Sequence, residues 1–592
     1  MSNYLIAALS PDTRPAIEAW VALHASDDSE HRFVPVPGGE LLIMSRRVSR
    51  SVAGNHFVRG TVVSENGDKI GYGLSAWPII SHGPASITGG EYVAAAWSFR
   101  DVAVWTDTYR AVPLLYTSGP GIVATSDSML LLADLRRHLG LAVSANDEAV
   151  IARSRTLALH SQQLSSDTFV QEISWCPAGR HLRIAFDHGE PTVRVHGTSA
   201  YEKFSSTDMS YQEMVRAACG AVAGQMRAIT SLDGAVPMLG LTGGRDSRVL
   251  LAGAIRAGDV GRMLVHVHKA TSENDVDYER AVEIARVRGF RINNPKDFDF
   301  GETVSYGAST PTAIWATAFM GTYDRLVPNH TSHGRPLSIP MTGLGAELSK
   351  GNYGWRSLEG VLDYFTSERA DSSVHRVERA EAFEAQFRKG LSDLGVPDDH
   401  PWASEWHYLG YRNGLHSGAH LAMTMIGLRP LNQSVMARFA LNPEARKSVD
   451  TGTQLIPDML SVMHKEVASL PYDRPEREIT LEEASRRRSA LGGALQESEI
   501  PEVQILGHPT EVPLGPLSHG LRIAEQAGLD LDHGDPDGML AAARDWLDGI
   551  AHPTTKAIYE DLFTLTRNQF ARLKPSHAGP GPAKLLAARL FV

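Results

Sequence analysis

The sequence predicts an α/β protein with two domains, a mostly β N-terminal part followed by a parallel-sheet part that ends in helices. Three observations support this prediction. Short apolar runs separated by Gly, Pro, Asn and Ser recur from residue 1 to about 200, as in strands joined by turns. An apolar run at 237–241 passes through two glycines into a helical pattern that ends near Ala257, as in a parallel sheet. At 592 residues the chain is also too long for a single hydrophobic core.

Regular elements are expected throughout both parts. In the N-terminal part we expect strands at 40–44, 56–63, 102–106, 114–116 and 121–125, a helix at 130–139 and a hairpin of 180–186 with 192–196. Residues 197–207 are expected to link the two parts, and helical spacing predicts a helix from 210 to 230. Later helices are expected at 358–365, 374–391, 405–425 and 433–441, whereas 474–488 and 573–583 are expected to be loops or solvated faces.

The strand-to-helix connection within 237–255 carries the strongest functional pattern. Its apolar run is followed by Thr242-Gly243-Gly244-Arg245-Asp246-Ser247 before the helical pattern begins. Two glycines let the backbone approach a ligand closely, and the hydroxyl groups and first-turn amides can bind phosphate groups there. Asp246 would repel a bare phosphate, so its presence indicates a bridging Mg²⁺ ion. The alternative is an ordinary turn in which Asp246 caps the helix.

A second strand is expected at 263–268, after this helix. His266 and His268 would share one face of it, and with no third ligand in view they are interpreted as strand residues rather than as metal ligands. The acid-rich segment from Ser272 to Ala285 predicts a helix whose N-terminus is favoured by the helix dipole.

The connection resembles the pyrophosphate loop Ser-Gly-Gly-x-Asp-Ser of the ATP pyrophosphatases, with Thr242 in place of the first serine. A second stretch, 339–353, resembles the asparagine synthetase block Ser-Gly-Glu-Gly-Ala-Asp-Glu-Leu-Phe-Gly-Gly-Tyr; the residues in register are Thr342, Gly343, Gly345, Ala346, Gly351 and Tyr353. Glu347 replaces the aspartate of that block, so the resemblance implies Mg²⁺ held by Asp246 and Glu347.

The same resemblance implies an ATP site, whose expected residues are Thr242, Gly243, Gly244, Ser247, Gly343, Val265 and Val267. The two valines belong to the second strand, which borders adenine in the family. Asp277, or the nearby Asp275, matches an aspartate that precedes a helix in the synthetases, although an acid-rich helix start explains both equally well.

The N-terminal part carries a weaker resemblance in the matching order along the chain. Residues 105–116 and 123–127 resemble a turn and strand of class II glutamine amidotransferase domains, which precede the pyrophosphate-loop domain in asparagine synthetase. Glutaminase activity is not expected, because no cysteine occurs before Cys176. β-Lactam synthetase and the lasso-peptide cyclases have lost it in the same way. The resemblance implies an Ntn-hydrolase-like α+β sandwich at 1–205 and an adenine-nucleotide α-hydrolase-like domain at 206–592.

The function implied is an AMP-forming amide ligase. A substrate carboxylate would be adenylated by ATP, and a substrate amine would then attack it to release AMP and pyrophosphate. The amine and carboxylate would belong to a small molecule or to a precursor peptide, as in natural-product biosynthesis, and a macrolactam-forming cyclase would also need a partner protease. The alternative is a non-catalytic descendant that binds a nucleotide or a protein partner.

Several positions depart from the family pattern. Where β-lactam synthetases carry a tyrosine, a glutamate and a lysine for the second half-reaction, this chain has Leu344, no glutamate near Arg429, and Glu476. Arg245 is expected to act on the phosphates as a catalytic cation; Arg248 is expected either to do the same or to lie on a solvated helix face.

Composition narrows the possible binding partners, the roles of the cysteines and the location of the protein. A net charge of −11 argues against nonspecific binding to nucleic acid or to an anionic membrane. The two cysteines, Cys176 and Cys219, are too few for a disulfide framework and are expected to fill the core. No run of about 20 apolar residues is present, and the expected location is the cytoplasm.

Overall fold

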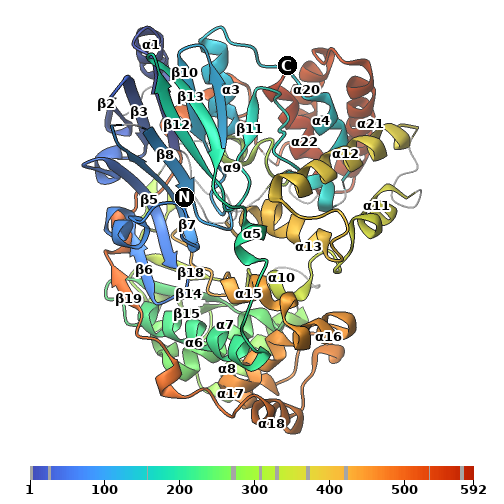
Figure 1. Cartoon of the computed structure of the whole chain (residues 1–592). Coiled ribbons are helices and arrows are strands. Elements are labelled where there is room, and N and C mark those ends of the chain that lie inside the picture. The colour runs from blue at the N-terminus through green and yellow to red at the C-terminus, as the bar shows by residue number, and fades with distance from the viewer. Residues whose placement is uncertain are drawn as a thin grey trace.

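The computed structural model describes residues 4–24, 28–99, 101–156, 158–268, 275–305, 310–326, 333–367, 374–418, 425–532, 534–573 and 579–592. The chain is a mixed α/β protein with several sheets, one of them parallel, which confirms the predicted fold class at that level. In Figure 1 the N-terminal strands, drawn in blue to teal, lie above the parallel sheet, and the red C-terminal helices lie to one side of those strands.

Two sheets make up the N-terminal part. The first has the order β11 (Ile173–Trp175), β9 (Leu115–Gly119), β10 (Ile122–Ser126), β1 (Tyr4–Leu9), β3 (Gly39–Ser45) and β2 (His31–Val36). The second has the order β13 (Glu190–His196), β12 (His181–Asp187), β8 (Asp101–Thr106), β7 (Thr88–Trp97), β5 (His56–Ser64), β6 (Lys69–Tyr72) and β19 (Gln504–Leu506), with β4 (Val52–Ala53) paired to β5. The predicted N-terminal strands and the hairpin are confirmed to within a few residues.

Both faces of the first sheet are buried, which explains why β1 is apolar at every position. Alternate residues such as Ile6 share a core with the second sheet, whereas Leu5 and its alternates pack under a layer of helices. The helices that contact one another there are α1 (Arg14–His24), α3 (Met129–His138), α9 (Pro311–Phe319) and α19 (Ser518–Gln526). The predicted helix at 130–139 is confirmed as α3.

The parallel sheet has β14 (Val236–Gly240) at its centre, between β15 (Leu264–His266) and β18 (Ser338–Met341). Single parallel bridges extend it to Ile292 on one side and to Leu428 on the other. Helices α6 (Tyr211–Thr230), α7 (Asp246–Ala257) and α17 (Leu455–Ala468) pack against one another beside it. The predicted helix at 210–230 is confirmed, and Cys219 is buried within it as a free thiol, as Cys176 is elsewhere.

The chain beyond residue 350 is largely helical, as predicted. Its helices are α11 (Leu358–Thr366), α12 (Arg376–Leu394), α13 (Ala403–His407), α14 (Asn413–Gly418), α15 (Ser434–Arg438), α16 (Pro443–Thr451), α18 (Leu481–Ala490), α20 (Pro536–Asp548), α21 (Pro553–Phe570) and α22 (Gly581–Ala587). The predicted helix at 405–425 is interrupted by a π-helical turn at Tyr408–Arg412, and its last residues lie outside the described ranges.

Two segments expected as loops or solvated faces are partly helical. The charged stretch at 474–488 enters α18, where Ala484 is buried, and one of its charged residues faces inward, since Arg487 pairs with the buried Asp458 at 2.9 Å. The Pro/Gly-rich tail leads into α22, where Lys584 is fully buried; residues 574–578 are outside the described ranges. Beyond residue 500 the chain returns to the N-terminal part, since β19 joins its second sheet and α21 contacts α4 (Asp147–Ala152). None of the helices in the described ranges is both long and apolar enough to span a membrane.

Candidate active site at the carboxyl edge of the parallel sheet

The loop Thr242–Ser247, called the first loop below, and the stretch 339–353, called the second block, meet at one edge of the parallel sheet. Leu239 of β14 lies beside Met341 of β18 in parallel register, so the loops that follow both strands leave the same edge. The chain places β15 on one side of β14 and β18 on the other, which makes this edge a topological switch point, where open α/β sheets bind ligands. A Cβ at Gly343 would lie 2.6 Å from the Cβ of Asp246 and 2.8 Å from the Ser247 nitrogen. The second block therefore crosses directly over the N-terminus of α7.

Hydrogen bonds inside the first loop fix its shape. The Ser247 hydroxyl accepts the Thr242 N–H at 3.0 Å and lies 3.1 Å from the Thr242 hydroxyl. The Gly244 N–H donates to the Thr242 hydroxyl at 3.3 Å. These bonds hold the two predicted phosphate-binding hydroxyl groups side by side, next to the first-turn amides of α7.

Gly243 joins this loop to α8 (Asp275–Arg288). Its N–H donates to the Asp277 carboxylate at 2.8 Å, and a Cβ at Gly243 would lie 2.8 Å from the same carboxylate oxygen. Asp277 is thus the acid that the structure brings to the loop, whereas Asp275 is the first residue of the helix. The close approach requires glycine at this position.

Asp246 and Glu347, the two carboxylates predicted to hold Mg²⁺, converge on one ammonium group. Lys350, at the end of α10 (Glu347–Lys350), forms an ion pair with Asp246. Its Nζ also lies 3.8 Å from Glu347 Oε1. The pKa of Asp246 is raised by burial, while Lys350 opposes the rise and Glu347 adds to it. The two loops therefore bring together two partly buried carboxylates that a single cation can reach.

A distant segment, 470–477, lies against the first loop and is held there by Arg248. This guanidinium donates to the carbonyl oxygens of Leu470 at 2.6 Å and Pro471 at 2.8 Å, and it lies 3.7 Å from the centroid of the Tyr472 ring. It also donates to the Gly243 carbonyl at 3.3 Å. Arg248 is fully buried, so the expectation of a solvated helix face is wrong; one charged side chain instead satisfies several backbone carbonyls.

Arg245 also contacts this segment. Its Nε and Nη2 donate to the Arg477 carbonyl at 3.1 and 2.6 Å. The Arg477 guanidinium donates to Asp473 at 2.8 and 3.0 Å and lies 3.6 Å from the Cβ position of Gly244. Arg477 follows Glu476, the residue at the position where the synthetases have lysine, and so places a cation beside the first loop one position later.

Val265 and Val267 are placed in the core beside the sheet edge. Their side chains are 0% and 3% exposed. The Val267 backbone is paired with the Asn293 side chain, which accepts the Val267 N–H at 2.8 Å and donates to its carbonyl at 3.0 Å. This pairing explains why β15 ends at His266, earlier than predicted. Among the described residues no group of three or more acidic, His or Cys side chains could hold a metal ion. His266 ends β15, and the ring centroids of His266 and His268 are 6.4 Å apart.

Thr342 of the second block faces the same edge. Its hydroxyl oxygen is buried and has no hydrogen-bond partner among the described residues. A buried hydroxyl without a partner costs free energy unless a ligand or water satisfies it. The Thr342 hydroxyl is thus a buried polar group in the second block whose partner the described residues do not supply.

The Glu405 carboxylate anchors the C-terminal end of the second block. This carboxylate accepts the N–H groups of Asn352 and Tyr353 at 2.8 Å each and of Trp355 at 3.2 Å. The Tyr353 hydroxyl donates to Gln162 of the N-terminal part at 2.5 Å. The second block is therefore fixed to both halves of the chain.

The N-terminal stretch that resembles amidotransferases forms a buried structural turn. The Asp107 carboxylate accepts the N–H groups of Tyr109 at 3.0 Å and Ala111 at 2.9 Å. On the neighbouring strand, Glu91 forms a buried ion pair with Arg429 at 2.8 Å. Arg429 follows Leu428, which bridges to β18, so this pair connects the N-terminal sheet to the parallel sheet.

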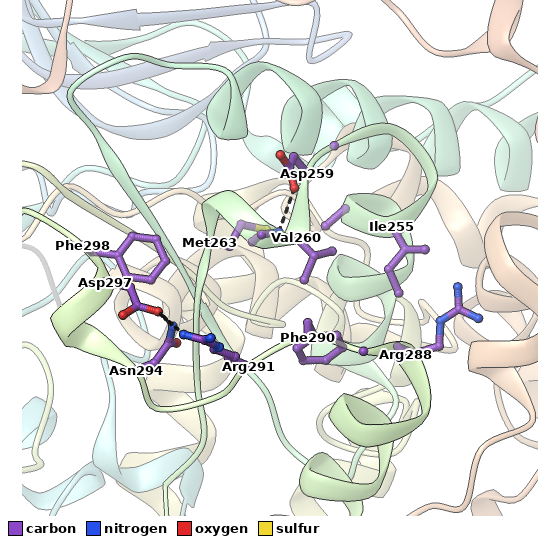
Figure 2. A pocket seen from close by; sticks show the side chains of 14 residues that line it. Ile255, Asp259, Val260, Met263, Arg288, Phe290, Arg291, Asn294, Asp297 and Phe298 are labelled. Atoms are coloured by element: carbon purple, nitrogen blue, oxygen red, sulfur yellow. Dashed lines mark hydrogen bonds and ion pairs between the residues drawn. The ribbon is translucent and has the colours of Figure 1, made fainter.

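A cavity of about 540 Å³ lies elsewhere, at the far end of α7. Figure 2 shows Ile255, Val260 and Phe290 lining it, with Arg291 paired to Asp297 at its rim. Because α7 has 12 residues, this cavity is about 18 Å from the loop that begins at Thr242. It lies at the amino end of β15 and is separate from the sheet edge described above.

Two residues at the edge, Lys350 and Arg477, were not predicted from sequence. Lys350 carried a usable signal, since its spacing of three from Glu347 places both on one helix face, whereas Arg477 carried no local signal. Asp277 was one of two aspartates that the sequence offered, and it is the one in contact with the loop. No protein-family model matches the chain, and no curated protein matches it. The resemblance to the synthetases consequently rests on the motifs and on the geometry of the two loops.

Proposed function

We propose that this protein is an ATP-dependent amide ligase that adenylates a carboxylate and passes it to a substrate amine, with release of AMP and pyrophosphate. One observation carries the proposal: the two motif loops lie in contact at a topological switch point, with Asp246 and Glu347 converging on one cation. The layered N-terminal sheets are compatible with an Ntn-hydrolase-like sandwich, and the parallel sheet with an adenine-nucleotide α-hydrolase-like domain.

The chain's own groups would act mainly by positioning and by charge. The amides of Gly243 and Gly244, with the Thr242 and Ser247 hydroxyls, would bind the phosphate chain at the N-terminus of α7. Asp246 and Glu347 would hold Mg²⁺, which supplies charge neutralisation for the departing pyrophosphate.

Cations of the 470–477 segment would assist from the opposite side. Arg477 lies against Gly244, and Arg245 holds the Arg477 carbonyl, so Arg245 acts on the phosphates through the position of this segment. This segment is distant in sequence from the first loop, and its docking would close one wall of the site.

The amine acceptor is proposed to belong to a small metabolite or to a precursor peptide. In the peptide case the product is a macrolactam and a protease partner prepares the substrate. Both versions share the first half-reaction, so one experiment tests them together.

The test is Mg²⁺-dependent ATP binding by the full chain, measured by calorimetry, followed by pyrophosphate release with a panel of carboxylate and amine pairs. The wild type should bind ATP more tightly with Mg²⁺ than without it. Asp246→Ala and Glu347→Gln should each weaken Mg²⁺-dependent binding at least about tenfold, since each removes a carboxylate from the ion. Asp259→Asn, at the far end of α7, is the matched control and should bind as the wild type does.

Two results would contradict the proposal. Mg²⁺-independent or undetectable ATP binding would exclude nucleotide activation altogether. Normal ATP binding without pyrophosphate release for any pair would favour a non-catalytic nucleotide-binding protein.

A further inference from the structure

Lys350 occupies the position where the two proposed metal ligands meet. It is the last residue of α10 and Glu347 is the first, so the two side chains share one face. Asp246 reaches the same ammonium from the N-terminus of α7. The side chains of Asp246, Glu347 and Lys350 are 27%, 15% and 36% exposed, so water screens this cluster only in part.

The charges of this cluster do not balance. Asp246 and Glu347 face the Lys350 ammonium. The Arg477 guanidinium, which pairs with Asp473, also acts on Asp246. These three carboxylates and two cations leave one negative charge in excess. Like charges this close destabilise each other, and burial adds to the cost. Lys350 reduces that cost, yet an ammonium and a divalent ion placed on the same pair of carboxylates repel each other. A metal ion that binds there therefore weakens the contacts that Lys350 makes with Asp246 and Glu347.

We propose that Lys350 competes with the divalent cation for Asp246 and Glu347, so that the ion binds firmly only together with ATP. The ion gains phosphate oxygens as ligands when it arrives with the nucleotide, and an ammonium provides no equivalent. Lys350 thereby acts as a positioning residue that couples metal binding to nucleotide binding. The identity of the site rests on the proposed function, but the competition is a property of three side chains and can be measured without turnover.

The experiment uses Mn²⁺ as the probe, with the full chain and without nucleotide, by following the electron paramagnetic resonance signal of free Mn²⁺. Lys350→Met should bind one Mn²⁺ ion about tenfold more tightly than the wild type, because the competing charge is gone. Lys350→Arg keeps the charge and should stay near the wild type. Adding Asp246→Asn to Lys350→Met should abolish the gain.

Lys556→Met is the matched control. Its lysine is 39% exposed and pairs with a single carboxylate, Asp548, at 4.0 Å, so Mn²⁺ binding should be unchanged. Equal Mn²⁺ affinity of Lys350→Met and the wild type would overturn the proposal, as would a gain that survives Asp246→Asn. Lys350→Gln provides a second neutral variant should Lys350→Met fold poorly. If the Mn²⁺ results hold but no Mg²⁺-dependent ATP binding is found, the ligase proposal fails and the competition stands.

Discussion

The substitution Gly343→Ala tests the contact on which the candidate site depends. Gly343 lies where the second block crosses the N-terminus of α7, and its missing side chain is what permits the approach. An added Cβ would lie 2.6 Å from the Cβ of Asp246 and 2.8 Å from both its carbonyl carbon and the nitrogen of Ser247. Two of these three neighbours are backbone atoms, so no side-chain rotation relieves the contact.

The size of the effect follows from that geometry. Ordinary contact begins near 3.4 Å, so the second block and α7 must separate by roughly 0.8 Å. Because Asp246 and Glu347 sit on opposite sides of this contact, the separation moves one carboxylate away from the other. A misplacement of about 1 Å costs about a hundredfold in rate, and overpacking costs about 1–3 kcal/mol of folding free energy. We expect Mg²⁺-dependent pyrophosphate release to fall about a hundredfold and the urea midpoint to shift down.

Gly360→Ala is the matched control for this change. A Cβ there would meet its first neighbour, Arg356, at 3.5 Å, an ordinary contact, within helix α11. Alanine should therefore be neutral or stabilise the helix by up to about 1 kcal/mol. Wild-type ATP affinity and pyrophosphate release in Gly343→Ala would refute the packing of the second block on α7.

Two further predictions concern stability. Lys584, buried in α22, pairs with Asp324 at 2.8 Å, as Arg153 also does, and its ammonium donates to the carbonyl oxygens of Arg153 and His160. Lys584→Met keeps the Arg153–Asp324 pair but removes the donor to these buried carbonyls, so it should cost about 1–3 kcal/mol in urea unfolding, and a neutral or stabilising effect would contradict this. His407 is fully buried, and burial lowers its pKa to about 4, with its Nε2 within 2.7 Å of the Leu164 carbonyl. Below about pH 6.5 the His407 imidazole binds a proton in the unfolded chain but not in the folded chain. The free energy of unfolding is therefore highest above about pH 6.5, with respect to this group, and falls as the pH drops toward 4. Between about pH 6.5 and pH 4, the free energy of unfolding measured in urea should fall less steeply in His407→Gln than in the wild type. An equal pH dependence of this free energy in the two proteins would exclude His407 as a cause of the loss.

Local patterns predicted the parts of the site that local chemistry determines. Apolar residues running into Thr242-Gly243-Gly244 predict a strand, a tight loop and a helix, and the structure has them at β14 and α7. Gly343 was placed in the site by its register in the second block. Its close approach to Asp246 gives a physical reason for glycine there. Such positions are predictable because backbone geometry restricts which residues fit.

Contacts between segments that are distant in the sequence could not be predicted from local patterns. The 470–477 segment reaches the loop through Arg248, whose helical spacing is equally compatible with a solvated face. The return of the C-terminal region to the N-terminal sheets includes β19, which is three residues long. Such short runs and single charged residues carry no periodic signal, and their partners are known only once the chain is folded.

The pairing of charges in the site shows what ligand binding must exchange. Asp277 accepts the Gly243 N–H, and Lys350 pairs with Asp246. Folding satisfies these groups internally, since buried polar groups without partners destabilise a protein. A phosphate that takes the Gly243 amide must displace Asp277, and a metal ion that takes Asp246 must displace Lys350. Asp277 and Lys350 stay in the protein when they are displaced, so a bound phosphate adds negative charge to the site and a bound metal ion adds positive charge; the two together change its net charge less than either one alone. ATP and its metal ion should therefore bind cooperatively, with each raising the affinity for the other by the same factor.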